Sequence, residues 1–216
     1  MLEKMDTFFE ARLEGYDDHM LANIDGAGEF YPFTAACLPQ DPGASVLDLG
    51  CGTGLELGFY FSGNPLVHVT GIDLSAGMLN ALQKKFPGHS LTLIQGSYFD
   101  LPLGNSCYDA AVSVESLHHF PQEEKTGLYR KLHAALKSDG YFILTDYFSL
   151  SDAEEASFRQ ELLRLKTEQG IADNEFYHYD TPLTVAHETE ALLTAGFSRV
   201  TVLRNWGATY TLKAEK

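Results

Sequence analysis

The residues with the most specific chemistry form a glycine-rich turn after a short apolar run. The segment reads Val46, Leu47, Asp48, Leu49, Gly50, Cys51, Gly52, Thr53 and Gly54, and Asp73 ends the next apolar run. Glycine has no Cβ and tolerates positive φ, so alternate glycines let the backbone turn tightly and approach a ligand closely. A carboxylate accepts two hydrogen bonds at once, which suits the diol of a ribose. The turn and Asp73 together predict a site for a cofactor that carries a nucleoside.

The spacing of the glycines separates the kinds of nucleotide site. A dinucleotide site has the pattern G-x-G-x-x-G, with the pyrophosphate at a helix N-terminus. Here Leu55 follows Gly54, and no Lys-Ser or Lys-Thr pair follows, so the turn is not a P-loop either. Asp48, beside the turn, would repel a pyrophosphate but attract an ammonium or sulfonium group. An NAD(P)-dependent oxidoreductase is therefore the weaker alternative.

Five blocks, in order, resemble the motifs of class I S-adenosylmethionine-dependent methyltransferases, of the small-molecule, ubiquinone/menaquinone-methylase-like kind. The first block is Asp48-x-Gly50-x-Gly52-x-Gly54, and the others span residues 71–79, 96–102, 108–120 and 136–141. The resemblance implies S-adenosylmethionine as cofactor, S-adenosylhomocysteine as product and a small-molecule acceptor. A protein that binds S-adenosylmethionine without catalysis is the other alternative.

The resemblance also implies which residues contact the cofactor. Asp73 would bind the ribose hydroxyls, Leu74 and Met78 would pack on the adenine, and Asp48 would act near the methionine part. Tyr16 belongs to a Tyr-Asp pair of the kind that often caps the cofactor in this family. The full set of expected contacts is Tyr16, Asp48, Gly50, Cys51, Gly52, Asp73, Leu74, Met78, Ser97, Tyr98, Val114 and His119.

Ser97 departs from the family pattern, because many members carry an acid there that accepts from the adenine amino group. A serine hydroxyl still accepts a hydrogen bond but brings no charge. Adenine recognition is therefore expected to use Ser97 and Tyr98 together with their backbone groups.

No residue pattern names a catalytic group. Glu115, His118 and His119 follow the fourth predicted strand, where cofactor and substrate should meet. Consecutive residues rarely point the same way, so no metal site is predicted from the adjacent histidines. Methyl transfer from a sulfonium is an in-line displacement with a neutral leaving group, so a base is needed only if the acceptor must lose a proton. The catalytic residue and the acceptor atom (oxygen, nitrogen, carbon or sulfur) stay open.

Alternating apolar runs and helical periodicity predict an α/β fold with a mostly parallel sheet. Strands are expected at 45–49, 67–73, 91–95, 108–114 and 140–147, with helices at 54–62, 76–86 and 122–137. Residues 199–203 and 208–212 predict a terminal antiparallel hairpin. The resemblance implies a Rossmann-like three-layer sandwich with seven strands in the order 3-2-1-4-5-7-6.

The remaining segments are expected to cover the site within one domain, 1–216. Residues 1–40 would form a helical cap, with one helix over 1–24, and 147–181 a lid insertion. Helices are predicted over 151–169 and 182–195, the second with Thr181 as N-cap and Gly196 as C-cap. His178, Tyr179 and Asp180 are candidates for the substrate pocket. Aromatic side chains in these segments favour a small, partly apolar substrate: Phe8, Phe9, Phe30, Tyr31, Phe33, Tyr147, Phe148, Phe176, Tyr177 and Tyr179.

Composition narrows the class of protein. The 216 residues carry a formal charge of −15, which argues against a nucleic-acid partner because phosphate contacts need clustered Lys and Arg. No apolar run approaches the roughly 20 residues that span a bilayer, and the N-terminus lacks a signal-peptide pattern. Three cysteines fit neither a disulfide framework nor a CxxC metal site. The expectation is a cytoplasmic monomer or homodimer that does not bind a membrane.

Overall fold

The computed structural model describes residues 1–172, 175 and 177–216, which form a seven-stranded sheet in the order β3-β2-β1-β4-β5-β7-β6. The strands are β1 (Ser45–Leu49), β2 (His68–Asp73), β3 (Ser90–Gln95), β4 (Tyr108–Val114), β5 (Leu136–Tyr147), β6 (Arg199–Trp206) and β7 (Thr209–Glu215). Strands β1 to β5 run parallel, whereas β7 is antiparallel to both β5 and β6. The predicted Rossmann-like sheet and its terminal hairpin are confirmed.

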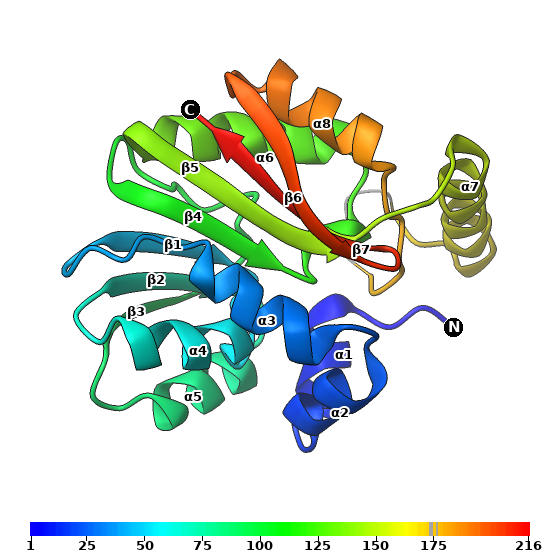
Figure 1. The fold of residues 1–216 in the computed structure, drawn as a ribbon. Coiled ribbons are helices and arrows are strands. Elements are labelled where there is room, and N and C mark those ends of the chain that lie inside the picture. The colour runs from blue at the N-terminus through cyan, green and yellow to red at the C-terminus, as the bar shows by residue number, and fades with distance from the viewer. Residues whose placement is uncertain (173–174, 176) are drawn as a thin grey trace.

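Helices cover both faces of this sheet (Figure 1). They are α1 (Met5–Ala11), α2 (Tyr16–Asn23), α3 (Ala27–Ala36), α4 (Leu55–Gly63), α5 (Ala76–Lys85), η1 (Leu117–His119), α6 (Gln122–Ala135), α7 (Asp152–Gln169) and α8 (Val185–Thr194). Helices α3, α4 and α5 pack on one face, and α6 and α8 on the other. Within the described part of the chain, no helix combines the length and apolarity needed to cross a membrane.

Side chains of the central strands alternate between two apolar cores. In β1, Val46 packs with Leu57 of α4, whereas Leu47 belongs to the cluster that includes Leu128 of α6. All four side chains are at most 1 % exposed. Burial of such a side chain contributes roughly 1.5–3 kcal/mol. Packing on both faces therefore fixes the strands, and with them the turns at their carboxyl ends.

The N-terminal region differs from the single helix predicted over 1–24. The chain forms α1 and α2, separated at Gly15, whose φ of 80° lies in the left-handed region. Gly26, also at φ 80°, separates α2 from α3, and α3 holds Pro32 inside it. Left-handed glycines interrupt the regular helical hydrogen bonding, so a continuous periodicity of apolar residues did not produce a continuous helix.

Other predicted boundaries are also wrong. Strands β6 and β7 end at Trp206 and Glu215 rather than at 203 and 212. Strand β5 begins at Leu136, directly after α6, rather than at 140. Helix α8 begins after Thr184, whose hydroxyl accepts a hydrogen bond from the amide of His187 at 3.3 Å, so Thr184 and not Thr181 is the N-cap. Gly196 follows the helix with φ 114°, beyond the C-cap residue Ala195. The prediction failed because Thr181 and Thr184 are both suitable N-cap residues, and the sequence alone does not distinguish them.

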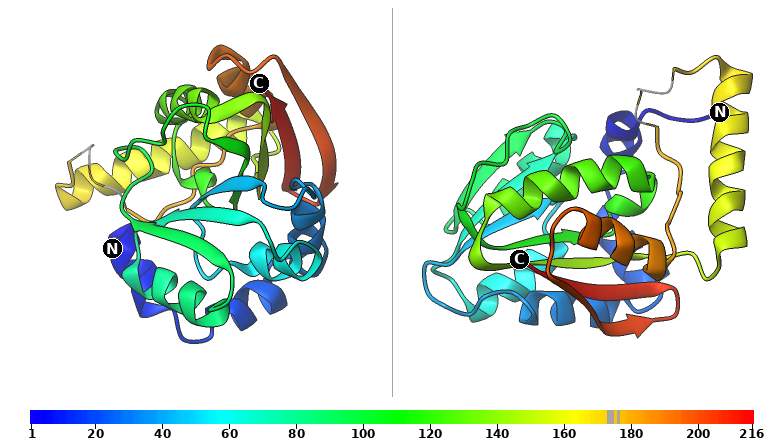
Figure 2. Two further views of the ribbon diagram at one scale, coloured as in Figure 1. Left: turned by 90° about the vertical axis from the view of Figure 1, so that its left-hand side faces the viewer. Right: turned by 90° about the horizontal axis from the view of Figure 1, so that it is seen from above.

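The carboxyl ends of the parallel strands meet at one edge of the sheet, where ligands of this architecture bind. Segments far apart in the sequence meet over this edge. The amide of His178 donates to the carbonyl of Glu3 at 3.0 Å, and the amide of Leu2 donates to Oε1 of Gln169 at the end of α7 at 2.9 Å. Figure 2 shows the N-terminus beside α7. The N-terminal segment is therefore hydrogen-bonded both to α7 and to the segment that contains His178.

Candidate active site

The glycine turn has the backbone geometry that its sequence predicts. The φ angle is 72° at Gly50, 48° at Gly52 and 71° at Gly54, all in the left-handed region. A Cβ built at Gly50 would lie 2.0 Å from Oγ of Ser116, while nothing lies within 4 Å of one built at Gly52. Oδ2 of Asp73 accepts a hydrogen bond from the amide of Gly52 at 2.9 Å. The end of β2 thus holds the turn that follows β1.

A cavity of about 60 Å³ lies beside this turn and is called the cofactor cavity below. It brings together nine of the twelve residues that were expected to contact the cofactor. These are Tyr16, Gly50, Gly52, Asp73, Leu74, Met78, Tyr98, Val114 and His119. Met5, Phe9, Glu115 and Ser116 complete its lining. Contact between each residue and the cofactor stays a prediction, but their convergence on one cavity is a feature of the fold.

The other three expected residues lie outside this lining. Asp48 is 1 % exposed and sits beneath the turn; burial raises its pKa well above the usual value, and the nearby Glu56 carboxylate raises it further. Cys51 is buried, and its Sγ lies 2.7 Å from the position that a Cβ on Gly71 would take. Oγ of Ser97 accepts a hydrogen bond from the amide of Phe99 at 3.2 Å. In this arrangement all three support the walls rather than line them.

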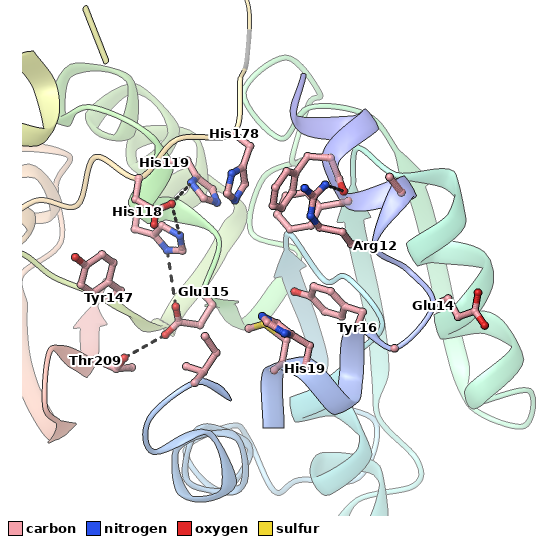
Figure 3. A pocket seen from close by; sticks show the side chains of 17 residues that line it. Arg12, Glu14, Tyr16, His19, Glu115, His118, His119, Tyr147, His178 and Thr209 are labelled. Carbon is pink, nitrogen blue, oxygen red and sulfur yellow. Dashed lines mark hydrogen bonds and ion pairs between the residues drawn. The ribbon is translucent and has the colours of Figure 1, made fainter. Parts of the chain in front are cut away.

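A second cavity of about 910 Å³, called the large pocket below, adjoins the first. Phe9, Tyr16, Glu115 and His119 line both cavities. Figure 3 shows His118 and His119 on one wall of the large pocket, with Arg12 and Tyr16 on the opposite side. Side chains from α1, α2 and the turn after β4 thus enclose a space next to the cofactor cavity.

The two adjacent histidines of η1 both reach Asp180. Nε2 of His118 lies 3.5 Å from Oδ1 of Asp180, and Nδ1 of His119 lies 3.1 Å from the same oxygen. The expectation that consecutive histidines point apart is wrong here, since the ring centroids are 4.0 Å apart. The amide of Thr181 donates to the carbonyl of His118 at 2.8 Å, which holds the segment with Asp180 against this tight turn.

Asp146, at the end of β5, orients His118. Its Oδ1 lies 2.5 Å from Nδ1 of His118, and its Oδ2 accepts from the amide of Leu117 at 2.9 Å. Burial lowers the pKa of His118, but the carboxylates of Asp146 and Asp180 outweigh it and raise the pKa well above its usual value. Burial and the neighbouring His118 lower the pKa of His119 to about 4. The two rings therefore have opposite tendencies to carry charge.

Glu115 occupies the junction of the two cavities in a strained backbone conformation. Its φ is 49°, which is uncommon for a residue other than glycine and concentrates at functional sites. Burial raises the pKa of its carboxyl group to about 8, with a further contribution from the charge of Asp146. The hydroxyl of Thr209 donates to Oε1 of Glu115 at 3.3 Å. A carboxyl group held in this way can be neutral near pH 7.

The aromatic side chains that were expected to line the substrate site divide among several places. Phe8, Phe9 and Tyr147 line the large pocket, as do His178 and Asp180. Phe30, Tyr31 and Phe148 are buried in the cores, Phe33 packs on Trp206, and Tyr177 lines a groove beside α7. Tyr179 is not part of the large-pocket lining, and Phe176 lies outside the described residues. The pocket is therefore more polar than the aromatic content predicted.

Several residues that line the two cavities or support them were not singled out by the sequence, among them three polar residues near the strand ends. Asp146 reads as a strand residue, Ser116 as a loop residue, and Thr209 as part of the terminal hairpin. Each comes from the carboxyl end of β4 or β5, or from β7 beside it. The one available signal was position, because polar residues at the carboxyl ends of parallel strands face the ligand.

The sequence has relatives among methyltransferases. Residues 46–140 match a family described as a methyltransferase domain. The chain is 29 % identical over 168 residues to a sterol 24-C-methyltransferase of Gibberella zeae, an alignment that covers 72 % of this chain and 40 % of that protein. It is 27 % identical to an uncharacterized methyltransferase of Oceanobacillus iheyensis, over 72 % of this chain and 71 % of the relative. The chain thus matches less than half the length of the first relative and most of the second.

The fold is also found among solved structures. A candidate O-methyltransferase from Nostoc punctiforme superposes with a TM-score of 0.74 at 21 % sequence identity, over 99 % of this chain and 62 % of that one. The matched region contains the glycine turn, Asp73 and His119. Human N-acetylserotonin methyltransferase, solved in complex with S-adenosylmethionine, superposes with a TM-score of 0.67 at 15 % identity, over 98 % of this chain and 56 % of that one. The ubiquinone/menaquinone-methylase-like subtype stays a prediction. Over residues 46–140 the chain is similar to the methyltransferase domain, and its fold is that of a solved methyltransferase-like structure.

Proposed function

We propose that this protein transfers the methyl group of S-adenosylmethionine to a small-molecule acceptor held in the large pocket. The cofactor would lie along the glycine turn, with its ribose on Asp73 and its adenine between Leu74 and Met78. Residues 1–40 would act as a cap and 147–181 as a lid insertion, both within one domain, 1–216.

The observation that carries this proposal is the shared wall between the two cavities. Phe9, Tyr16, Glu115 and His119 line both, so a sulfonium group beside these side chains would face the large pocket. Holding donor and acceptor in line supplies about 7–11 kcal/mol in well-aligned systems. The leaving group departs neutral, so alignment and exclusion of water are the main requirements.

The lining of the large pocket favours a compact acceptor with both apolar and polar parts. Phe8 and Phe9 supply apolar contacts, whereas His118, His119 and Asp180 supply polar ones. A volume of about 910 Å³ falls within the roughly 300–1,000 Å³ range of small-molecule sites. The formal charge of −15 supports an acceptor other than a nucleic acid.

Calorimetric titration followed by a turnover assay tests the proposal. S-adenosylmethionine and S-adenosylhomocysteine should bind with one site per chain, whereas NADH should not bind. Methyl-labelled S-adenosylmethionine should then transfer its label to a member of a panel of small hydroxyl, amine, thiol and activated-carbon compounds. Binding without transfer to any member would favour the non-catalytic alternative, and binding of NADH alone would overturn the cofactor assignment.

A further inference from the structure

Two imidazole nitrogens and a carboxylate oxygen converge on one wall of the large pocket. Oδ1 of Asp180 lies 3.5 Å from Nε2 of His118 and 3.1 Å from Nδ1 of His119. The two histidine side chains are 10 % and 3 % exposed, and Figure 3 shows them side by side. Oδ1 is shielded from solvent, and among the described residues it has no hydrogen-bond partner besides these two nearby nitrogens. Two imidazole nitrogens around a shielded carboxylate oxygen can hold a cation when the nitrogens that face it carry no proton.

We propose that His118, His119 and Asp180 bind one divalent transition-metal ion. Ligand distances of about 2.0–2.2 Å place two ligands of one ion roughly 2.8–3.6 Å apart in octahedral or tetrahedral geometry. The observed separations of 3.1 and 3.5 Å fall in this range. Imidazole suits ions such as Zn²⁺, Fe²⁺ and Ni²⁺, whereas Mg²⁺ and Ca²⁺ prefer oxygen ligands. The donor set therefore selects a transition metal.

Asp146 supplies the outer contact that metal-binding histidines usually have. Such a ring commonly donates its other N–H to a carboxylate, which fixes its tautomer and orientation. Nδ1 of His118 lies 2.5 Å from Oδ1 of Asp146, so its Nε2 is the atom directed at Asp180 and His119. A separation of 2.5 Å suits a hydrogen bond and is too short for two ligands of one ion. Glu115, His118 and Asp146 also lie close enough to form a metal site, but this short contact makes them the weaker candidate.

The ion would have a direct connection to the pocket. Two histidines and a carboxylate form the ligand set of catalytic zinc sites, which keep a position for water or substrate. His118, His119 and Asp180 all line the large pocket, and His119 also lines the cofactor cavity. The ligand of the open position would be an oxygen or nitrogen donor of the acceptor. That role rests on the proposed function, whereas binding of the ion does not.

Metal binding is tested on the full chain without cofactor or acceptor. Protein freed of metal with a chelator is titrated with Zn²⁺ or Co²⁺, and bound ion is measured by elemental analysis and by the visible absorption of Co²⁺. We expect one ion per chain. His119→Ala and Asp180→Asn should each weaken binding by at least about tenfold, and Asp146→Asn by about 10–100-fold. His68→Ala changes an exposed histidine at the start of β2 and should bind as the unaltered protein does.

Circular dichroism and thermal unfolding verify that each variant folds. The Asp180 side chain is 44 % exposed, so Asp180→Asn is expected to keep the fold even if a histidine variant does not. Absence of stoichiometric binding by the folded protein would overturn the proposal. So would binding that persists unchanged in Asp180→Asn, or that His68→Ala weakens equally. Because none of these readouts involves methyl transfer, a missing acceptor in the turnover assay does not affect the result.

Discussion

The carboxylate of Asp73 accepts a hydrogen bond from the amide of Gly52 across 2.9 Å, which joins the end of β2 to the turn after β1. Its other oxygen accepts from the amide of Ser75 at 2.8 Å. The same carboxylate lines the cofactor cavity. One side chain thus shapes the turn and lines the cavity in which we propose that the ribose binds.

Asp73→Ala should weaken S-adenosylmethionine binding at least about tenfold, which corresponds to about 1.4 kcal/mol. The loss has two causes, because the ribose loses its acceptor and the turn loses its anchor. Calorimetry measures the dissociation constant. Asp41→Ala alters an exposed acid before β1, at the opposite edge of the sheet, and should leave the constant unchanged. An unchanged constant in folded Asp73→Ala would remove the ribose assignment.

Two alanine substitutions in the glycine turn should separate folding from binding. Gly52→Ala places a Cβ in open space at φ 48°, so it should cost only the left-handed strain of about 1–2 kcal/mol while obstructing the cofactor. Gly50→Ala places a Cβ 2.0 Å from Oγ of Ser116 and should lose more stability. Denaturant unfolding and calorimetry measure the two effects.

Gly170→Ala is the matched control for these variants. Gly170 has φ 64° and open space around its Cβ position, but it ends α7, away from the glycine turn. Gly170→Ala should lower the free energy of unfolding about as much as Gly52→Ala does, while its affinity for S-adenosylmethionine stays unchanged. The interpretation fails if Gly52→Ala binds S-adenosylmethionine as tightly as Gly170→Ala does.

A buried ion pair joins α6 to α8. Nζ of Lys125 lies 2.6 Å from Oε2 of Glu188, both side chains are at most 2 % exposed, and the hydroxyl of Tyr129 donates to Oε1 of Glu188. Glu188→Leu leaves the ammonium group buried and unpaired, so it should lower the free energy of unfolding by about 3–5 kcal/mol.

Replacing the whole group should cost less than replacing one member. The triple variant Lys125→Met, Tyr129→Phe, Glu188→Leu removes every polar partner and should recover most of the stability. Urea unfolding measures the free energies of unfolding. A triple variant no more stable than Glu188→Leu would show that the polar group itself, and not the orphaned charge, determines the loss.

The buried Asp48 should make stability depend on pH. Burial, followed by the Glu56 charge, raises the pKa of Asp48 well above 3.8 in the folded state. The folded protein then holds this proton more tightly than the unfolded chain does. Stability from this group is therefore lost as pH rises from the unfolded value through the folded pKa.

Asp48→Asn removes that titration. The free energy of unfolding of the variant, relative to the unaltered protein, should increase between pH 4.5 and 8. Guanidinium unfolding at several pH values measures this difference, and Asp41→Asn, at an exposed position, should show a flat one. A difference that falls with pH for Asp48→Asn would contradict the assigned direction of the pKa.

The sequence predicted the sheet well because its signals are local. Apolar runs mark β1, β2 and β4 to within a residue, and a glycine turn follows β1. The N-terminal region was harder, since Gly15 and Gly26 precede α2 and α3 in left-handed backbone conformations that apolar periodicity does not reveal.

The cluster of polar residues in the site could not be predicted from local sequence patterns. His118 and His119 meet because η1 is a tight turn, and Asp180 joins them from a segment about sixty residues away, a contact that only tertiary packing creates. The residues expected to contact the cofactor could be predicted from the sequence because five motifs, in a fixed order, contain most of them. By contrast, Asp48, Cys51 and Ser97 carry motif positions but lie behind the cavity wall.

The central claim is that the cofactor lies along the glycine turn with its sulfur toward the large pocket. A crystal structure with S-adenosylhomocysteine bound tests it most directly. The ribose hydroxyls should lie within hydrogen-bond distance of Asp73, and the sulfur should lie beside Glu115 and His119, where the two cavities meet. Electron density for the ligand at any other place, or a sulfur directed away from the large pocket, would contradict the account.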